Sequence, residues 1–166
     1  VLPFMNDIIK IEGKGNKFGL KKLSGEVILA TKYDRIDSLS ELVFAVTLEG
    51  KLGFMNLKGE TVIPFDYDAF DEEVAFYNGL ACVKKSRDDG SYRFGYIDHR
   101  NEVVIPFQFS GAQTFKDKDY IENWITYPAG GDKSYTRDTY KLALDGTVLM
   151  VDSEHFEDTS WYKEWE

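Results

Sequence analysis

Residues 93–109 read RFGYIDHRNEVVIPFQF, and the plan of this stretch occurs two further times in the chain. Aligned on a glycine, the three copies keep one register without a gap: GLKKLSGEVILATKYD from Gly19, GFMNLKGETVIPFDYD from Gly53 and GYIDHRNEVVIPFQFS from Gly95. In each copy a Gly or Asn stands six residues after that glycine, and an aromatic residue stands fourteen residues after it. Such self-similarity is the signature of a repeat protein, so the repeat decides the fold.

Each repeat is predicted to contain three short strands. The glycines lie 34 and 42 residues apart (53 − 19 and 95 − 53), and the apolar runs between them are joined by turns that contain glycine. Pro64 and Pro106 are expected to end their strands, because proline cannot donate to a ladder. No stretch shows strong helical periodicity. The predicted strands are Ile8–Glu12, Lys17–Leu23, Glu26–Ala30, Leu42–Glu49, Leu52–Leu57, Glu60–Pro64, Leu80–Ser86, Tyr92–Asp98 and Glu102–Pro106.

The two ends of the chain follow the plan less closely. Residues 1–9 align with residues 62–70, so the chain is expected to open inside a repeat, either truncated naturally or cut from a preceding part. A degenerate fourth copy carries Tyr140 at the glycine position. Its predicted strands are Tyr120–Pro128, Tyr135–Asp145 and 146–150.

We therefore predict an all-β fold in which antiparallel three-stranded units stack as an open repeat array. About four units are expected, the first and last of them incomplete, and each is too small to close a core alone. The alternative is a partial β-propeller with one triplet in each blade. Residues 1–166 are predicted to be a single domain with units at 1–9 (partial), 10–38, 39–76, 77–115 and 116–152 (degenerate), followed by an acidic, aromatic tail at 153–166.

Several of these stretches resemble the bacterial WG (KWG) β-repeat, whose pattern runs roughly G-L-A-x-V, K-W-G-Y-I-D, x-G-x-x-V-I-P and later aromatics. The matching residues are Asn78–Val83, Arg93–Asp98, Val104–Pro106 and Phe115. The resemblance implies a bacterial source and a non-enzymatic scaffold. One departure concerns the family's Trp before the glycine, which is replaced here by Phe18, Leu52 and Phe94, so no binding through that indole is expected.

The charge of the chain is strongly acidic and unevenly placed. The net charge is −9, and residues 1–50 balance with seven basic and seven acidic side chains, so the surplus (13 basic against 22 acidic) lies in residues 51–166. This charge argues against nucleic-acid binding and is compatible with a basic protein partner, a bound cation or simple solubility. No apolar run is long enough to span a membrane. A cytoplasmic location is favoured, and a periplasmic or surface location would follow if a signal segment was removed.

The sequence contains few residues arranged as a metal site or a catalytic site. Five carboxylates lie within eight residues at 66–73, but the glycine turn of a calcium loop is missing, so a solvated acidic corner is expected. His99 and His155 stand in no zinc motif, and no nucleophile elbow or phosphate loop is visible. Cys82, the only cysteine, lies in an apolar run and is expected in the core. We predict no cofactor, no metal and no enzymatic activity, with a hydrolase as the least favoured alternative.

The candidate binding residues are aromatic and acidic. All three tryptophans and several tyrosines gather between residue 124 and the C-terminus, a composition that suits an interface hot spot and equally a cap over the last sheet edge. We predict a protein-interaction module that binds a basic protein, such as an inhibitor or immunity protein that occludes a toxin; the alternative is a cell-envelope module that binds carbohydrate. The predicted binding residues are Trp124, Tyr127, Tyr135, Tyr140, Trp161, Tyr162, Trp165, Asp71, Glu72 and Glu73.

Overall fold

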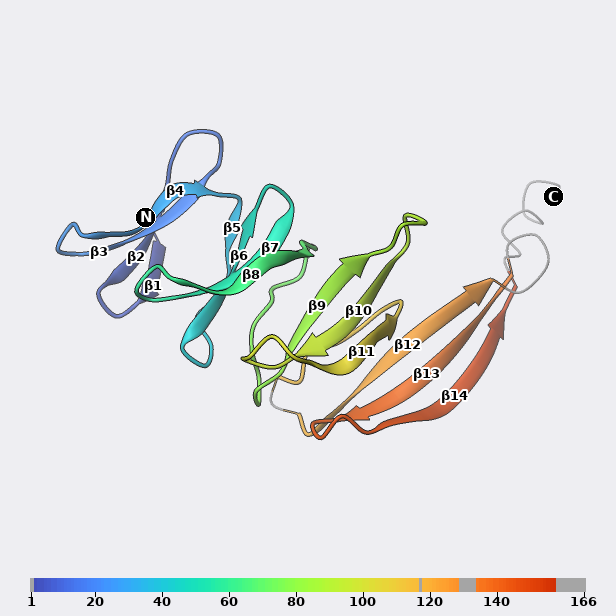
Figure 1. Cartoon of the computed structure of the whole chain (residues 1–166). Coiled ribbons are helices and arrows are strands. Elements are labelled where there is room, and N and C mark those ends of the chain that lie inside the picture. Colours follow the sequence, from blue (N-terminus) through green and yellow to red (C-terminus); the bar gives the residue numbers. More distant parts are fainter. Residues whose placement is uncertain (1, 117, 129–133, 158–166) are drawn as a thin grey trace, which may run out of the picture.

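The computed structural model describes residues 2–116, 118–128 and 134–157, and within these residues the chain folds into fourteen strands without a helix (Figure 1). The strands are β1 (Leu2–Met5), β2 (Ile8–Glu12), β3 (Phe18–Lys22), β4 (Val27–Tyr33), β5 (Arg35–Ile36), β6 (Val43–Leu48), β7 (Lys51–Asn56), β8 (Thr61–Asp68), β9 (Ala81–Ser86), β10 (Tyr92–Ile97), β11 (Val103–Phe109), β12 (Tyr120–Pro128), β13 (Tyr135–Ala143) and β14 (Val148–Phe156).

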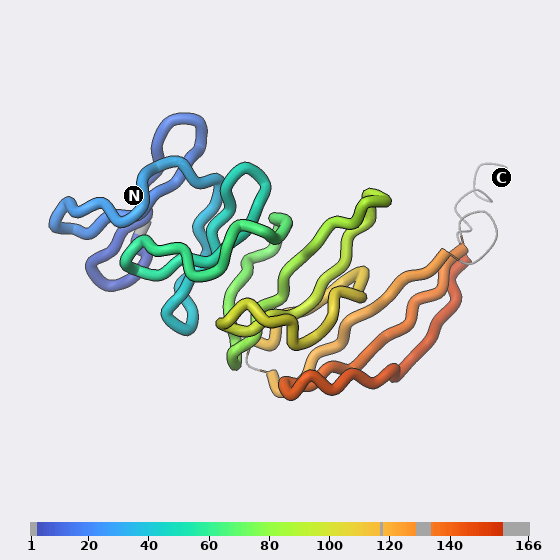
Figure 2. The backbone as a smooth tube through the Cα atoms, viewed as in Figure 1, coloured from blue at the N-terminus to red at the C-terminus, as the bar shows by residue number. Residues whose placement is uncertain are grey.

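The strands form antiparallel triplets that follow one another along the molecule. The orders are β1-β2-β3-β4 in a four-stranded sheet, β11-β10-β9-β8-β7-β6-β5 in a seven-stranded sheet and β12-β13-β14 in a three-stranded sheet. The two middle units therefore share one sheet, joined where Asp68 of β8 pairs with Lys84 of β9. The chain runs from one end of an open row to the other (Figure 2). The predicted all-β repeat array is confirmed.

The repeat glycine allows the third strand of a unit to bulge across the second. In the second unit Leu52 pairs with Tyr67 and Phe54 pairs with Ile63, so residues 64–66 arch over Gly53 alone. A Cβ atom on Gly53 would lie 2.7 Å from the carbonyl oxygen of Ile63, closer than real Cβ contacts permit. Gly19 and Gly95 have the same surroundings, which confirms that these glycines are close-packing positions.

The expectation that proline ends the third strand was wrong. β8 continues through Pro64 to Asp68, and β11 continues through Pro106 to Phe109. Both prolines lie inside the bulge, where the residue has no partner on the neighbouring strand. The missing N–H therefore interrupts no ladder bond, and the strand resumes pairing beyond the bulge.

The hydrophobic cores lie between successive units, as expected for units too small to close a core alone. The first core joins β2–β4 to β5–β7 around Leu20 and Phe44, and the second joins the two middle units around Phe54 and Phe76. The third core packs the β12–β13 pair against the third unit and contains Cys82, which is buried as predicted.

A side-chain acceptor at the end of each third strand links one unit to the next. Asp34 accepts the backbone N–H of Glu49 at 2.6 Å, and Asp68 accepts that of Ser86 at 2.5 Å. The third unit repeats the contact with a hydroxyl, since Ser110 Oγ accepts the backbone N–H of Thr126 at 3.0 Å. The junctions between units are therefore built from one recurring hydrogen bond as well as from apolar packing.

The fourth unit departs from the plan at its glycine position. Tyr140 replaces the glycine and packs against Phe109, with ring centroids 5.8 Å apart. β14 pairs with β13 at eight positions, from Tyr135 to Leu142, and skips only Val151, whereas β8 pairs with β7 at four. Without the glycine the wide bulge is lost, and the last sheet is longer and more regular than the others.

Candidate functional site: the acidic corner and the last sheet

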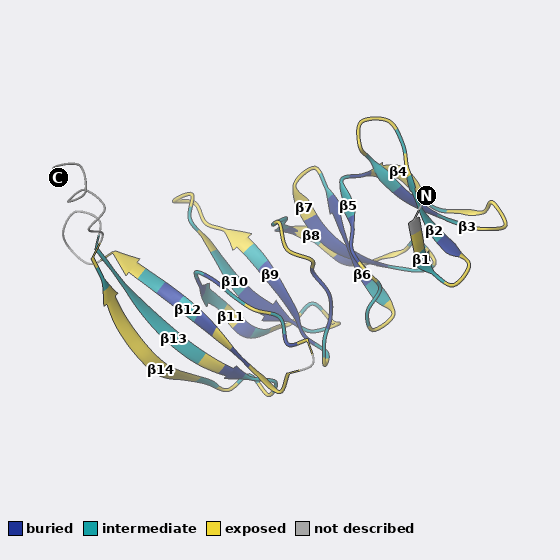
Figure 3. Cartoon of the chain, turned by 180° about the vertical axis from the view of Figure 1, so that it is seen from behind, coloured by how far each residue is buried: buried dark blue, intermediate teal, exposed yellow. Residues whose placement is uncertain are grey.

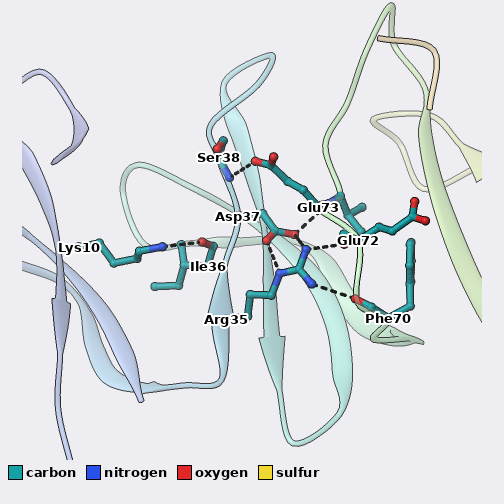
Figure 4. Close-up of polar contacts among 9 residues, drawn as sticks. Lys10, Arg35, Ile36, Asp37, Ser38, Phe70, Glu72 and Glu73 are labelled. Atoms are coloured by element: carbon teal, nitrogen blue, oxygen red, sulfur yellow. Dashed lines mark hydrogen bonds and ion pairs between the residues drawn. The ribbon is translucent and has the colours of Figure 1, made fainter. Parts of the chain in front are cut away.

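The acidic corner, residues 71–73, lies in the loop between β8 and β9 and is held by Arg35 and Asp37 from the preceding junction (Figure 4). The Arg35 guanidinium donates to the carbonyl of Phe70 at 2.9 Å and to the carbonyl of Glu72. Arg35 Nε also donates to Asp37 Oδ1 at 2.5 Å, so the ion pair lies at the base of the loop.

Asp37 is the buried member of this ion pair and is 7% exposed. Its Oδ2 accepts the backbone N–H of Val74 at 3.0 Å, which fixes the loop where it enters the second core. Burial raises the pKa of Asp37 above its ordinary value, and the hydrogen bonds from Val74 and Arg35 oppose that shift without cancelling it. Hydrogen bonds to Arg35 and Asp37 therefore hold the backbone of the loop in place.

The three predicted acidic residues separate into two kinds. Glu73 Oε1 accepts the backbone N–H of Ser38 at 3.1 Å, and hydrogen bonding from the Ser38 side chain, followed by this backbone bond, lowers the pKa of Glu73. Among the described residues, the carboxylates of Asp71 and Glu72 form no hydrogen bond or ion pair, and both are exposed. Glu73 therefore has a structural contact, and Asp71 and Glu72 are available to a partner.

Trp124 of β12 lies beside this corner. Its backbone pairs with Gly111, and its indole lies over that glycine, where a Cβ atom would be only 2.0 Å from the ring. The indole and Glu72 line one hollow of about 510 Å³, together with Gln113 and Lys118. The structure thus brings together an acidic and an aromatic residue that are far apart in the sequence.

The remaining aromatic candidates lie on two opposite faces of the last sheet. Strand alternation places Trp124 and Tyr135 on the outer face, turned away from the third core, and Tyr127 and Tyr140 on the inner face. Tyr140 packs against that core, and burial, followed by a hydrogen bond with Tyr127, raises its pKa. Tyr127 is 42% exposed at the far end of β12.

Two residues that the sequence did not single out complete the outer face. The Arg137 guanidinium lies 5.3 Å from the ring centre of Phe156, 5.8 Å from that of Trp124 and 5.9 Å from that of Tyr135. Phe156 and Tyr135 stack with centroids 4.9 Å apart. The alternation Tyr135-x-Arg137 was the available signal, because residues two apart in a strand share a face. The predicted tail residues Trp161, Tyr162 and Trp165 lie outside the described residues.

The last sheet is attached to the third unit by a buried hydrogen-bond network. Asn123 Nδ2 donates to the hydroxyl of Tyr96 at 2.7 Å, and that hydroxyl donates to the carbonyl of Gln113 at 2.5 Å. Tyr96 and Asn123 are both 0% exposed. Burial also raises the pKa of the neighbouring Cys82 thiol to about 12, so Cys82 stays protonated near neutral pH and is a poor nucleophile.

Two kinds of feature are absent from the part of the chain that the structure describes. Those residues contain no group of three or more His, Cys, Asp or Glu side chains arranged to hold a metal ion. They also contain no helix of the length and apolarity that a membrane crossing requires. The acidic corner, the hollow at Trp124 and the outer face of the last sheet are the candidate functional surfaces.

Comparison with known proteins supports the repeat assignment. The family described as WG containing repeat matches residues 53–86 and 94–122, which run through the second and third units to the start of β12. No curated protein matches the chain. Gly53 stands at the start of the first matched segment, and Gly95 is the second residue of the other. Residues 53–86 and 94–122 match the WG-containing repeat family, in agreement with the resemblance predicted from the sequence.

Proposed function

We propose that this chain is a non-enzymatic interaction module that binds a basic protein through Asp71, Glu72 and Trp124. The match to the WG-containing repeat family supports a repeat-type interaction module. The observation that carries the proposal is the hollow shared by Glu72 and the Trp124 indole, which brings an unpaired carboxylate beside an aromatic ring. An arginine or lysine of a partner could pair with the carboxylate and lie against the ring in one pose.

The surrounding charges favour the same class of partner. Residues 51–166 carry 22 acidic and 13 basic side chains, a surplus of nine negative charges. Lys116 and Lys118 line the hollow as well, so its own charge is mixed, and long-range attraction comes from the whole C-terminal part. An inhibitor or immunity protein that occludes a basic toxin is the specific role we propose.

The test compares three forms of the chain as bait in lysate of the source cell. Trp124→Ala with Asp71→Asn and Glu72→Gln removes the proposed site, and Glu12→Gln with Asp88→Asn changes two exposed carboxylates elsewhere by the same charge. We expect the wild type and the control to retain one basic protein and the site variant to lose it, with retention falling steeply as salt rises. Equal retention by all three forms would refute the site.

A second candidate function is carbohydrate binding, favoured by the polar lining of the same hollow. Gln113, Thr114 and Glu72 supply amide, hydroxyl and carboxylate groups around the Trp124 indole, a combination that suits stacking on a sugar ring. A glycan array tests it, followed by titration of tryptophan fluorescence. Saturable quenching that is insensitive to salt and lost in Trp124→Ala would favour this function over the first.

A further inference from the structure

The outer edge of β14 has no strand beside it, and the Ser153 N–H donates to the Asp152 carboxylate at 2.9 Å. β14 is the last strand of its sheet, and none of the described residues pairs with its free edge. Residues 149–155 are all exposed, with Leu149, Met150 and Val151 at 61%, 60% and 51% (Figure 3). Such an edge presents unpaired N–H and C=O groups to any extended segment that fits beside it.

The more continuous pairing of β14 accompanies the loss of the repeat glycine. In the first three units the third strand arches over a glycine, and that bulge interrupts the ladder. Tyr140 leaves no room for such an arch, so β14 stays paired with β13 at eight positions. This regular edge is suited to strand addition, which needs several successive main-chain hydrogen bonds.

A fifth repeat unit does not fit this end of the row. The residue after the repeat glycine is buried in the core shared with the next unit in all three earlier units, namely Leu20, Phe54 and Tyr96. The aromatic residue fourteen positions after the glycine is buried in the same cores, namely Tyr33, Tyr67 and Phe109. In the fourth unit Lys141 follows the glycine position, and Asp152 takes the place of the aromatic residue, because it pairs with Thr139, the residue before that position. Both are exposed, and a core there would have to desolvate two charges.

The side chains of β14 indicate which occupant the edge suits. The strand begins with the four apolar residues Val148–Val151 and continues with Asp152 and Glu154. A second copy of β14 would bring the same carboxylates to the interface, where they repel. An extended segment with apolar residues beside lysine or arginine complements both halves of the strand.

We propose that β14 receives an extended segment of a basic protein, which adds a strand to the last sheet. This inference rests on the proposed function, because it names the mode by which the same basic partner is held. The main chain of the segment pairs with the edge of β14 and supplies affinity, and its lysine or arginine side chains meet Asp152 and Glu154 and supply specificity.

The test uses a nine-residue peptide of alternating lysine and valine with blocked ends, at physiological salt. Two isomers are made, each N-methylated on alternate residues, so that each lacks the N–H groups of one edge while keeping the same charge. We expect the isomer methylated on the edge that faces β14 to bind at least tenfold more weakly than the parent, and the other isomer to bind like the parent. Equal affinity of the two isomers would overturn strand addition.

Variants of the chain itself provide a second readout. The turn bond from the Ala143 N–H to the Thr147 carbonyl makes Tyr140–Met150 a non-hydrogen-bonded pair by strand alternation, so the Met150 N–H faces the free edge. Met150→Pro removes that N–H without breaking the internal ladder, and Met150→Thr keeps it. We expect at least a tenfold loss of peptide affinity for the proline variant and none for the threonine variant, with unchanged circular dichroism for both. Retained affinity in the folded proline variant would contradict the inference.

Two outcomes separate this inference from the proposed function. If a basic protein is captured through Trp124, Asp71 and Glu72 but the two peptide isomers bind with equal affinity, the proposed function is supported and strand addition is refuted. A chain truncated after Glu157 tests whether the segment 158–166 occupies the edge of β14 in place of a partner. If only that shortened chain binds the peptide, the segment itself occupies the edge, and the inference of a partner strand is overturned.

Discussion

The Nζ atom of Lys51 lies 2.5 Å from Oδ1 of Asp68, across the neighbouring strands β7 and β8. The other oxygen of the same carboxylate accepts the backbone N–H of Ser86 in the following unit. The lysine two residues before the repeat glycine therefore orients a carboxylate that fastens one unit to the next. Lys17 and Asp34 form the same ion pair in the first unit, so the lysine of the repeat has a structural role at two junctions.

Asp68→Ala should destabilise the junction between the second and third units. The change removes the acceptor of the exposed Ser86 N–H, and such a hydrogen bond contributes about 0.5–1.5 kcal/mol of unfolding free energy. Asp68→Ser should lose less, because Ser110 makes the equivalent contact in the next unit with a hydroxyl. Urea unfolding measures the difference, with the exposed Asp66→Ala as control. Equal stability of Asp68→Ala and Asp66→Ala would contradict the role assigned to Asp68.

Gly53→Ala should disrupt the bulge of the second unit. The added Cβ would lie 2.7 Å from the carbonyl oxygen of Ile63 and 3.0 Å from the Phe65 ring, and the strand backbone cannot move away without breaking its pairing. Overpacking of this kind costs about 1–3 kcal/mol or more. Gly50→Ala is the comparison, since nothing lies within 4 Å of its Cβ position and only its positive φ of 78° is strained. Thermal unfolding should show the larger loss at Gly53, and a reversed order would refute the steric explanation.

Tyr96→Phe should loosen the last sheet from the third unit. The hydroxyl of Tyr96 accepts from Asn123 and donates to Gln113 in a fully buried position, so its removal leaves an amide N–H and a carbonyl without partners. We expect a loss of about 1–3 kcal/mol, together with faster hydrogen exchange in β12 and β13. The exposed Tyr92→Phe serves as the control and should change stability by less than about 0.5 kcal/mol. Unchanged exchange in β12 would show that the network does not hold the sheet.

The strands could be predicted well from the sequence because each repeat carries the same residue pattern independently. The glycine register located every central strand of the first three units, and the alternation of apolar residues located the flanking strands within a few residues. The continuation of β8 through Pro64 was not predicted, because a bulge depends on how a strand pairs with its neighbour. The residue types near Pro64 do not determine that pairing. The short strand β5 was missed for a similar reason, since Arg35 and Ile36 pair only with the following unit.

Only part of the candidate site could be predicted from the sequence, for the same physical reason. Composition identified Trp124 and the acidic corner, but the hollow that joins Trp124 to Glu72 exists only because successive units are packed together. Tyr140 was selected for its residue type, yet its place at the glycine position already indicated a role in the core beside Phe109. Register within a repeat therefore separates packing aromatics from surface aromatics better than composition does.

Acidification should unfold the protein, and the carboxylates that fasten the junctions should account for part of the loss. The hydrogen bond from Lys17, opposed by burial, lowers the pKa of Asp34; at Asp68 burial acts to raise the pKa, but the bonds from Lys51 and Ser86 outweigh it. A carboxyl whose folded pKa lies below its unfolded value stabilises the fold above the unfolded pKa, and that stability is lost as pH falls through the folded pKa. The loss should therefore develop below about pH 4.

Asp37 should act in the opposite direction, at pH values above its unfolded pKa. Burial raises the pKa of Asp37, so the folded state takes up that proton first, and the contribution of Asp37 to stability increases as pH falls toward its unfolded pKa. Unfolding in urea between pH 7 and pH 3 should show a shallower decline for Asp34→Asn with Asp68→Asn than for the wild type, because those variants no longer titrate. Asp71→Asn with Asp88→Asn changes two exposed carboxylates and is the control for net charge. If the control flattens the profile as much as the junction variant does, general charge repulsion and not the junction carboxylates sets the acid sensitivity.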